Sequence, residues 1–204
     1  MNTPLSHLRD QILSVVLLVL TFPLLIGTAI LIWLDDGTPI FFRQTRIGKN
    51  GQSFVIFKFR TLTTDVEGTT TPSQHTTRVG SFLRQWALDE LPQLWNVLRG
   101  DMNLVGPRPV LPSEATGYDD WASQRLRVRP GLTGWAQVRG RNNLGWKERI
   151  EHDLWYVHNQ NILLDLWILG KTPFVLFRGQ GVYGPGTEDP SESDVRSHLS
   201  SRDT

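Results

Sequence analysis

The sequence predicts an α+β fold in which one N-terminal membrane helix precedes a small domain of helices and a β-hairpin. Three observations carry this prediction: an uncharged apolar run near the N-terminus, alternating strand-like residues around a turn, and helical periodicity in the second half. The chain has 204 residues, of which 39% are hydrophobic, and this suits a single folded domain. We divide it into a membrane segment (1–36), a folded domain (37–182) and a disordered tail (183–204).

The membrane segment contains twenty-three successive residues without charge, from Ile12 to Leu34. At 1.5 Å per residue such a helix reaches across a hydrocarbon core of about 30 Å. Pro23 lies in its middle, and proline bends or breaks a helix because it lacks a backbone donor. Two topologies follow, a kinked crossing or a helix that enters and returns on one face. Basic residues lie on both sides of the segment, so charge does not decide between them.

The next part of the chain has the pattern of a hairpin. Two runs, Ile40–Arg43 and Phe54–Arg60, read as strands, and Lys49-Asn50-Gly51 reads as the turn between them. Strand alternation puts Lys58 and Arg60 on one face. The Thr-, Ser- and Gly-rich residues 65–77 are expected to form a mobile loop.

Helical patterns dominate the rest of the folded domain. They cover residues 78–88, 91–98, 118–128, 145–157 and 163–177. The last pattern mixes Trp167 and Phe174 with Lys171 and Arg178, which suits an amphipathic helix at a membrane interface. Packing against the domain is the alternative for this helix.

Charge and composition exclude several classes of protein. Residues 43–178 contain eighteen basic and twelve acidic side chains, which favours an anionic partner such as phosphate or lipid. No nucleic-acid-binding motif accompanies these charges, so we expect no nucleic-acid partner. The absence of cysteine excludes disulfides and thiolate metal sites, and the five histidines form no compact ligand pair.

The most informative segment is ALDELPQLWNVLRGDMNLVGPRP, residues 87–109. Asp89 has the position of a helix N-cap, Pro92 falls in the first turn, and Gly100 follows the last apolar residue. A helix start favours bound anions, including phosphate. Asp89 and Glu90 are therefore interpreted either as ordinary capping residues or as catalytic carboxylates.

Basic residues near this pair favour the catalytic interpretation. Arg108 stands between two prolines, which restrict the backbone and prepare its guanidinium to bind phosphate. Arg84 precedes the acidic pair by five residues, and Asp101 follows it. Carboxylates and guanidiniums gathered in this way suit a phosphoryl transfer assisted by magnesium.

Three ordered blocks of this chain resemble the bacterial sugar transferase family, the monotopic polyprenyl-phosphate phosphoglycosyl transferases. The blocks are FFRQTRIGKNGQSFVIFKFRTL, LDELPQLWNVLRGDMNLVGPRP and RPGLTGWAQVRGRNNLGWKERIEHDLWYV. The resemblance extends from about Arg9 to Val182. It implies transfer of a sugar-1-phosphate from a UDP-sugar to polyprenyl (undecaprenyl) phosphate, the first membrane step of glycoconjugate synthesis, at the cytoplasmic face of the bacterial inner membrane.

The resemblance also implies roles for individual residues. Asp89 corresponds to the nucleophile that holds the phosphosugar covalently, and Glu90 to its partner in the Asp-Glu pair, which helps to bind Mg²⁺. The phosphate-binding residues correspond to Lys58, Arg84 and Arg108, and we add Asp101 and Gln137 as site neighbours. The family's membrane helix is re-entrant and breaks at a Ser-Pro pair. This chain has Phe22-Pro23 there, with the hydroxyl of Thr21 as a substitute for the serine.

Two rivals accompany this hypothesis. One is a nonenzymatic membrane-anchored module that binds anionic lipid or a partner, and it predicts no role for Asp89 beyond capping. The other is a nucleotide-sugar hydrolase that uses the same carboxylates. The sequence leaves open the transferred sugar, the glycan pathway and the oligomeric state.

Overall fold

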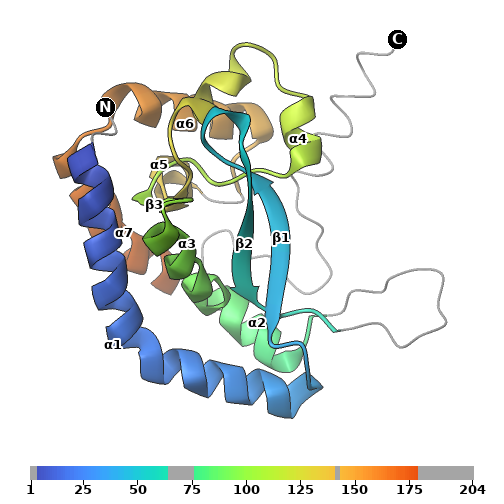
Figure 1. The fold of residues 1–204 in the computed structure, drawn as a ribbon. Helices are drawn as coiled ribbons and strands as arrows, with labels where there is room; N and C mark the ends of the chain where they lie inside the picture. Colours follow the sequence, from blue (N-terminus) through green and yellow to red (C-terminus); the bar gives the residue numbers. More distant parts are fainter. Residues whose placement is uncertain (1–3, 64–75, 141–142, 179–204) are drawn as a thin grey trace, which may run out of the picture.

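The computed structural model describes residues 4–63, 76–140 and 143–178. A long bent helix, α1 (Pro4–Asp36), borders a domain of short helices and two small β-ladders (Figure 1). This architecture confirms the α+β prediction. The expected loop at 65–77, apart from its last two residues, and the expected tail at 183–204 lie outside the described residues.

The hairpin is confirmed; its first strand is longer than the sequence predicts, and its second strand is shifted by one residue. Strands β1 (Phe41–Ile47) and β2 (Ser53–Phe59) pair antiparallel, with Phe41 opposite Phe59. They are joined by a single turn of 3₁₀ helix, η1 (Lys49–Gly51). Asn50 and Gly51 both adopt left-handed backbone angles there, and asparagine and glycine tolerate that region best.

Short helices follow the hairpin along the chain. In chain order these are α2 (Arg78–Gln85), the 3₁₀ helix η2 (Leu88–Gln93), α3 (Leu94–Arg99), α4 (Pro112–Thr116), η3 (Ala122–Arg127) and α5 (Trp135–Arg139). Two longer helices, α6 (Trp146–Asn159) and α7 (Ile162–Phe177), follow them. The helix expected at 91–98 is split between η2 and α3, and the one expected at 118–128 is a 3₁₀ helix. Pro173 does not interrupt α7.

A parallel ladder of two three-residue strands lies at the centre of the domain. Strand β3 (Asn103–Val105) pairs with β4 (Gly131–Thr133). The main core lies around this ladder, and its buried members are Ile56, Leu94, Val97, Met102, Leu104, Val105, Trp135, Val138, Tyr156, Ile168 and Val175. Residues from the hairpin, α3 and the last two helices therefore share one core.

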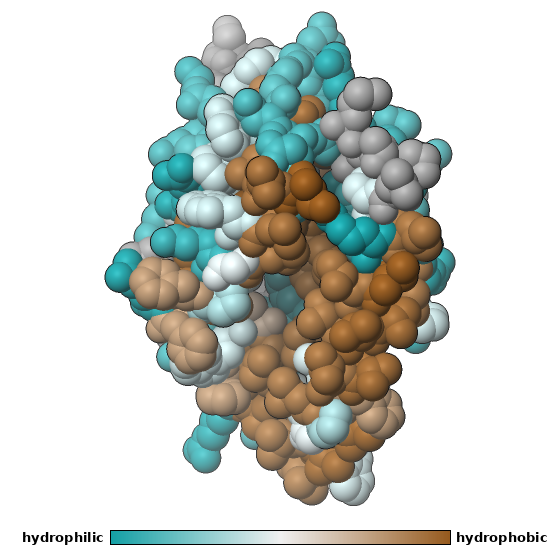
Figure 2. Space-filling view, turned by 90° about the vertical axis from the view of Figure 1, so that its left-hand side faces the viewer, coloured by the Kyte–Doolittle hydropathy of each residue, from teal (hydrophilic) through white to brown (hydrophobic). Residues whose placement is uncertain are grey.

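The apolar part of α1 is not covered by the domain. Its most hydrophobic stretch is only 11% buried, so it is not the core helix of a soluble protein. Apolar side chains of α1 continue into exposed ones of α7, among them Leu163, Leu166 and Phe177. Figure 2 shows this surface as a broad brown area over the lower part of the molecule. An exposed apolar surface of this extent is typical of a membrane protein.

Helix α1 bends sharply near its middle, as Figure 1 shows, and Pro23 lies inside it. Both arms of the bent helix are bonded to the same domain. At the N-terminal end, Arg9 forms an ion pair of 2.9 Å with Asp165 of α7. At the C-terminal end, Asp36 forms an ion pair with the buried Arg60. The hydroxyl of Thr21, the expected substitute for the family's serine, donates to the carbonyl of Leu17. The carbonyl that Pro23 leaves without its helical donor is a different one, that of Val19.

Candidate active site

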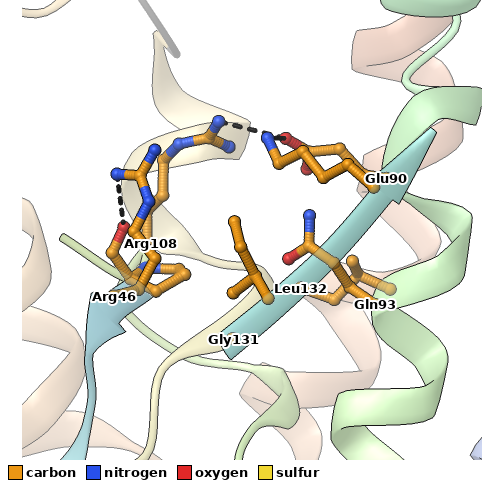
Figure 3. A pocket seen from close by; sticks show the side chains of 9 residues that line it. Arg46, Glu90, Gln93, Arg108, Gly131 and Leu132 are labelled. Atoms are coloured by element: carbon orange, nitrogen blue, oxygen red, sulfur yellow. Dashed lines mark hydrogen bonds and ion pairs between the residues drawn. The ribbon is translucent and has the colours of Figure 1, made fainter. Parts of the chain in front are cut away.

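Glu90 is the centre of a three-residue ionic cluster. The ammonium of Lys58 lies 2.8 Å from its Oε1 atom, and the guanidinium of Arg108 lies 3.0 Å from the same oxygen. Lys58 comes from β2 and Glu90 from η2, whereas Arg108 comes from the loop after β3. Figure 3 shows Arg108 reaching across the pocket toward Glu90. The fold thus joins residues 32 and 18 positions apart in the sequence.

The two cations determine the ionisation of Glu90. Burial opposes the charged carboxylate, but the charges of Arg108 and Lys58, together with their hydrogen bonds, outweigh burial. They hold the pKa of Glu90 well below its ordinary value. Glu90 is therefore an anion across the physiological pH range.

Asp89 lies beside this cluster in a different environment. The residue is only 8% exposed, and within the described residues no hydrogen bond to its carboxylate is recorded. Burial, and next the negative charge of Glu90, raise its pKa to about 6, although Lys58, Arg84 and Arg108 act in the opposite direction. A buried carboxylate without direct partners, close to three cations, is a suitable nucleophile for a phosphate group.

The N-cap assignment of Asp89 is wrong. Ala87 caps η2 and makes no side-chain hydrogen bond, while Asp89 is the second residue of the 3₁₀ helix. Ala87 adopts left-handed backbone angles, φ 52° and ψ 26°, which cost energy for a residue with a Cβ atom. This turn redirects the chain after α2 and places Asp89 and Glu90 next to β2.

Arg84 approaches the site from α2. Its Nε atom donates a 2.9 Å hydrogen bond to the hydroxyl of Thr61, and its charge lowers the pKa of Asp89. It is held near the nucleophile candidate without an ion pair to either carboxylate among the described residues.

Three glycines bring the Arg108 loop against β4. A Cβ atom at Gly106 would lie 2.6 Å from the carbonyl of Arg129, and one at Gly131 would lie 2.0 Å from the nitrogen of Gly106. At Gly134 it would lie 2.1 Å from the carbonyl of Gly106. No side chain fits these positions, so the backbones approach closely and fix where the loop begins.

A pocket opens between these elements. It is lined by Arg46, Ile56, Lys58, Glu90, Gln93, Arg108, Pro109, Gly131 and Leu132 (Figure 3). Sequence reasoning missed Arg46 and Gln93 as site residues. Gln93 follows Glu90 by three positions, which is one helical turn, and its side chain is buried. That spacing was the available signal, and Arg46 gave none beyond its place in the first block.

The two expected site neighbours lie elsewhere. Asp101 follows α3 and accepts a 3.1 Å hydrogen bond from the amide of Asn96. Gln137 belongs to α5, and its amide is buried beside Gly134. Neither side chain lines the pocket; Asp89 and Arg84 do not line it either, but both act electrostatically within the acidic pair's surroundings.

The acidic pair fits a magnesium ion whose ligands come partly from the protein and partly from a bound substrate. Within the described residues there is no cluster of three or more histidine or carboxylate side chains that would hold a metal alone. Asp89 and Glu90 supply two carboxylates, and both recorded bonds to Glu90 use Oε1. Mg²⁺ commonly binds one or two carboxylates and takes phosphate and water oxygens for the rest.

Comparison with known proteins adds independent findings. Residues 1–179 match the family described as bacterial sugar transferase. The chain is 40% identical to the uncharacterized sugar transferase EpsL of Bacillus subtilis, with 87% of this chain and 90% of that protein covered. It is 41% identical to the UDP-glucose:undecaprenyl-phosphate glucose-1-phosphate transferase of Xanthomonas campestris, with 81% of this chain and 37% of that protein covered. It is 35% identical to the undecaprenyl-phosphate galactose phosphotransferase of Salmonella typhimurium, where the shares are 88% and 42%.

Proposed function

Because this chain belongs to the bacterial sugar transferase family, we propose that it transfers a sugar-1-phosphate from a UDP-sugar to undecaprenyl phosphate through a covalent intermediate on Asp89. The observation that carries the proposal is the contrast within the acidic pair. Asp89 is buried and has no bonded partner in the part of the chain that the structure describes, while Glu90 is fixed between Lys58 and Arg108. The printed names of the relatives supply the class of donor and acceptor.

The proposed reaction has two displacements at one phosphorus atom. First, a carboxylate oxygen of Asp89 attacks the phosphorus next to the sugar, and the bond from that phosphorus to UMP breaks. UMP leaves with the bonding electron pair, and the phosphosugar remains on Asp89 as an acyl phosphate. A phosphate oxygen of undecaprenyl phosphate then attacks the same phosphorus, which releases Asp89 and gives a lipid diphosphosugar.

The cations around the pair serve the phosphates in this scheme. Arg108 is 43% exposed at its side chain and lines the pocket, which supports a role in binding a substrate phosphate in addition to Glu90. Lys58 and Arg84 add positive charge where the transferred group gains negative charge. Asp89 and Glu90 would hold Mg²⁺, which supplies charge neutralisation at the diphosphate when bound.

The decisive experiment separates transfer from the two rival functions. Wild-type protein given a UDP-sugar without acceptor should gain the mass of one phosphosugar and release about one UMP per chain. Asp89→Asn should show neither, and EDTA should suppress both. Continuous UMP release without lipid acceptor would indicate a hydrolase. Absence of any UMP release across a panel of UDP-sugars would support the nonenzymatic module.

We also propose that α1 is re-entrant and that the domain lies at the cytoplasmic face of the inner membrane. The support is that both ends of the bent helix are bonded to one polar domain, through Asp165 and through Arg60. The chain contains no cysteine, so single cysteines at Asn2 and Gly37 give unambiguous labelling. Both should react from the cytoplasmic side of intact membranes. Labelling from opposite sides would establish a full crossing.

A further inference from the structure

Arg125 forms a buried polar network directly behind the Arg108 loop. It lies in η3 and is 4% exposed. One terminal nitrogen forms an ion pair with Asp153 of α6, itself 1% exposed. The other donates a 2.7 Å hydrogen bond to the hydroxyl of Tyr118. Two helices and a tyrosine thus fix the plane of this guanidinium.

The third polar contact of Arg125 is with the Arg108 loop. Its Nη2 atom donates a 3.0 Å hydrogen bond to the backbone carbonyl of Arg108. The carbonyls of the flanking prolines are also held, Pro107 by the N–H of Gly131 at 2.9 Å and Pro109 by the guanidinium of Arg46 at 3.4 Å. Three successive carbonyls are therefore bonded to three different segments of the chain.

The hydrogen bond to the Arg108 carbonyl restricts the backbone rotation of Arg108 that the flanking prolines still allow. The proline rings fix φ at positions 107 and 109, and Pro109 confines Arg108 to extended backbone conformations, but within that region φ and ψ of Arg108 still vary. That rotation decides the direction of its Cα–Cβ bond and so the reach of its guanidinium toward Glu90. A donor at the Arg108 carbonyl restricts this rotation.

Stability alone is a weak explanation for this network. Burial of an ion pair costs several kcal/mol per ion before attraction repays it, and apolar residues of similar volume often stabilise a protein equally well. The pair packs beside an apolar cluster that includes Ala122, Ile150 and Leu154, where such residues would fit. Unlike an apolar side chain, Arg125 can donate a hydrogen bond to the Arg108 loop.

We propose that Arg125, held by Asp153 and Tyr118, is a positioning residue that orients Arg108 for phosphate binding. This inference rests on the proposed function, because Arg108 is taken as a substrate-phosphate ligand. Arg125 itself touches no substrate.

The test removes the network without leaving a buried charge unpaired. The double variant Arg125→Met/Asp153→Leu replaces the ion pair by apolar side chains and should stay folded. The rate of UMP release should fall about 10- to 100-fold, because misplacement of a phosphate ligand has effects of that order. The same double replacement made in an Arg108→Ala protein should cause less than about a twofold further loss.

A second buried arginine provides the matched control. Arg60 is 6% exposed, pairs with Asp36 and donates to the carbonyls of Pro39 and Gly37, at the end of α1 and not at the Arg108 loop. Arg60→Met/Asp36→Leu should lower UMP release by the same factor in the wild-type and Arg108→Ala proteins. If the Arg125/Asp153 replacement is equally independent of Arg108, its role is structural and the proposal fails.

Hydrogen–deuterium exchange gives a readout that needs no turnover. The Arg125/Asp153 replacement should speed exchange in the segment 106–110, and the Arg60/Asp36 replacement should not. Unchanged exchange in that segment would overturn the positioning role even if the enzyme transfers sugar phosphate. Conversely, wild-type protein that releases no UMP would overturn the proposed function, and exchange would still decide whether Arg125 orders the loop.

Discussion

The two members of the acidic pair, Asp89 and Glu90, lie in contrasting environments, and of the two only Glu90 lines the pocket. On one side, Glu90 is saturated by Lys58 and Arg108 and stays ionised. On the other, Asp89 is buried, has no bonded partner among residues 4–63, 76–140 and 143–178, and has a pKa raised to about 6. The same functional group is thus made a fixed anchor at one position and a free, reactive carboxylate at the next. Environment, and not residue type, assigns the two roles.

The largest effect on this contrast should come from Glu90→Gln. The neutral amide no longer holds Lys58 and Arg108 by charge, so both phosphate ligands lose their anchor, and one proposed magnesium ligand is lost as well. We expect UMP release to fall about 10³-fold, the size of effect seen when preorganised charge is removed from a site. Single-turnover UMP release measures it. Near-normal activity would show that Glu90 is only structural.

Arg108→Ala should cause the next largest loss, about 100-fold in UMP release. The side chain is partly exposed and its backbone is held by other segments, so folding should be little affected. Arg108→Lys should recover only part of the rate, because an ammonium does not reproduce the planar guanidinium. Full activity of Arg108→Lys would mean that charge alone matters at this position.

Arg84→Gln should have a smaller effect, about tenfold. Arg84 acts on Asp89 through its charge and bonds only the hydroxyl of Thr61, without an ion pair to the dyad among the described residues. Thr61→Val, which removes that hydroxyl, is the matched variant and should lose less than Arg84→Gln. A larger loss for Thr61→Val than for Arg84→Gln would mean that the hydrogen bond matters more than the charge of Arg84.

The last and smallest prediction is a gain, not a loss: Asp89→Asn should raise the thermal stability of the protein at high pH. The pKa of Asp89 is raised in the folded protein, so folding favours its protonated form. That contribution is fully present below about pH 4 and is lost as pH rises through about 6. Asp89→Asn should therefore match wild type near pH 4 and exceed its Tm by several °C at pH 8, measured in EDTA. A lower Tm for Asp89→Asn at pH 8 would contradict the buried, unpartnered carboxylate.

Local signals in the sequence predicted the hairpin and a residue of the pocket, Arg108, whereas Lys58 was identified through the family resemblance. Asn50-Gly51 tolerates the left-handed turn that joins the two strands. Arg108 stood out because prolines flank it. In each case a short pattern carries its own physical reason.

Other features depend on distant parts of the chain and left no local trace. Arg125 and Asp153 look like ordinary surface charges until η3 and α6 bring them together in the interior. Strands β3 and β4 have three residues each, too few for alternation to show. The cap of η2 was misplaced because Ala87, which gives no polar signal, takes the strained turn.

The bent α1 helix, bonded to the domain at both ends, bears on how such a chain is inserted. Its uncharged stretch lies between Arg9 and Asp36, the residues bonded to the domain. A helix held in this way can enter a bilayer without moving a charged residue to the far side, and its insertion then does no work against the transmembrane voltage. Insertion is then driven by burial of the apolar side chains of α1 in lipid, which contributes about 25 cal/mol for each Å² of apolar surface withdrawn from water.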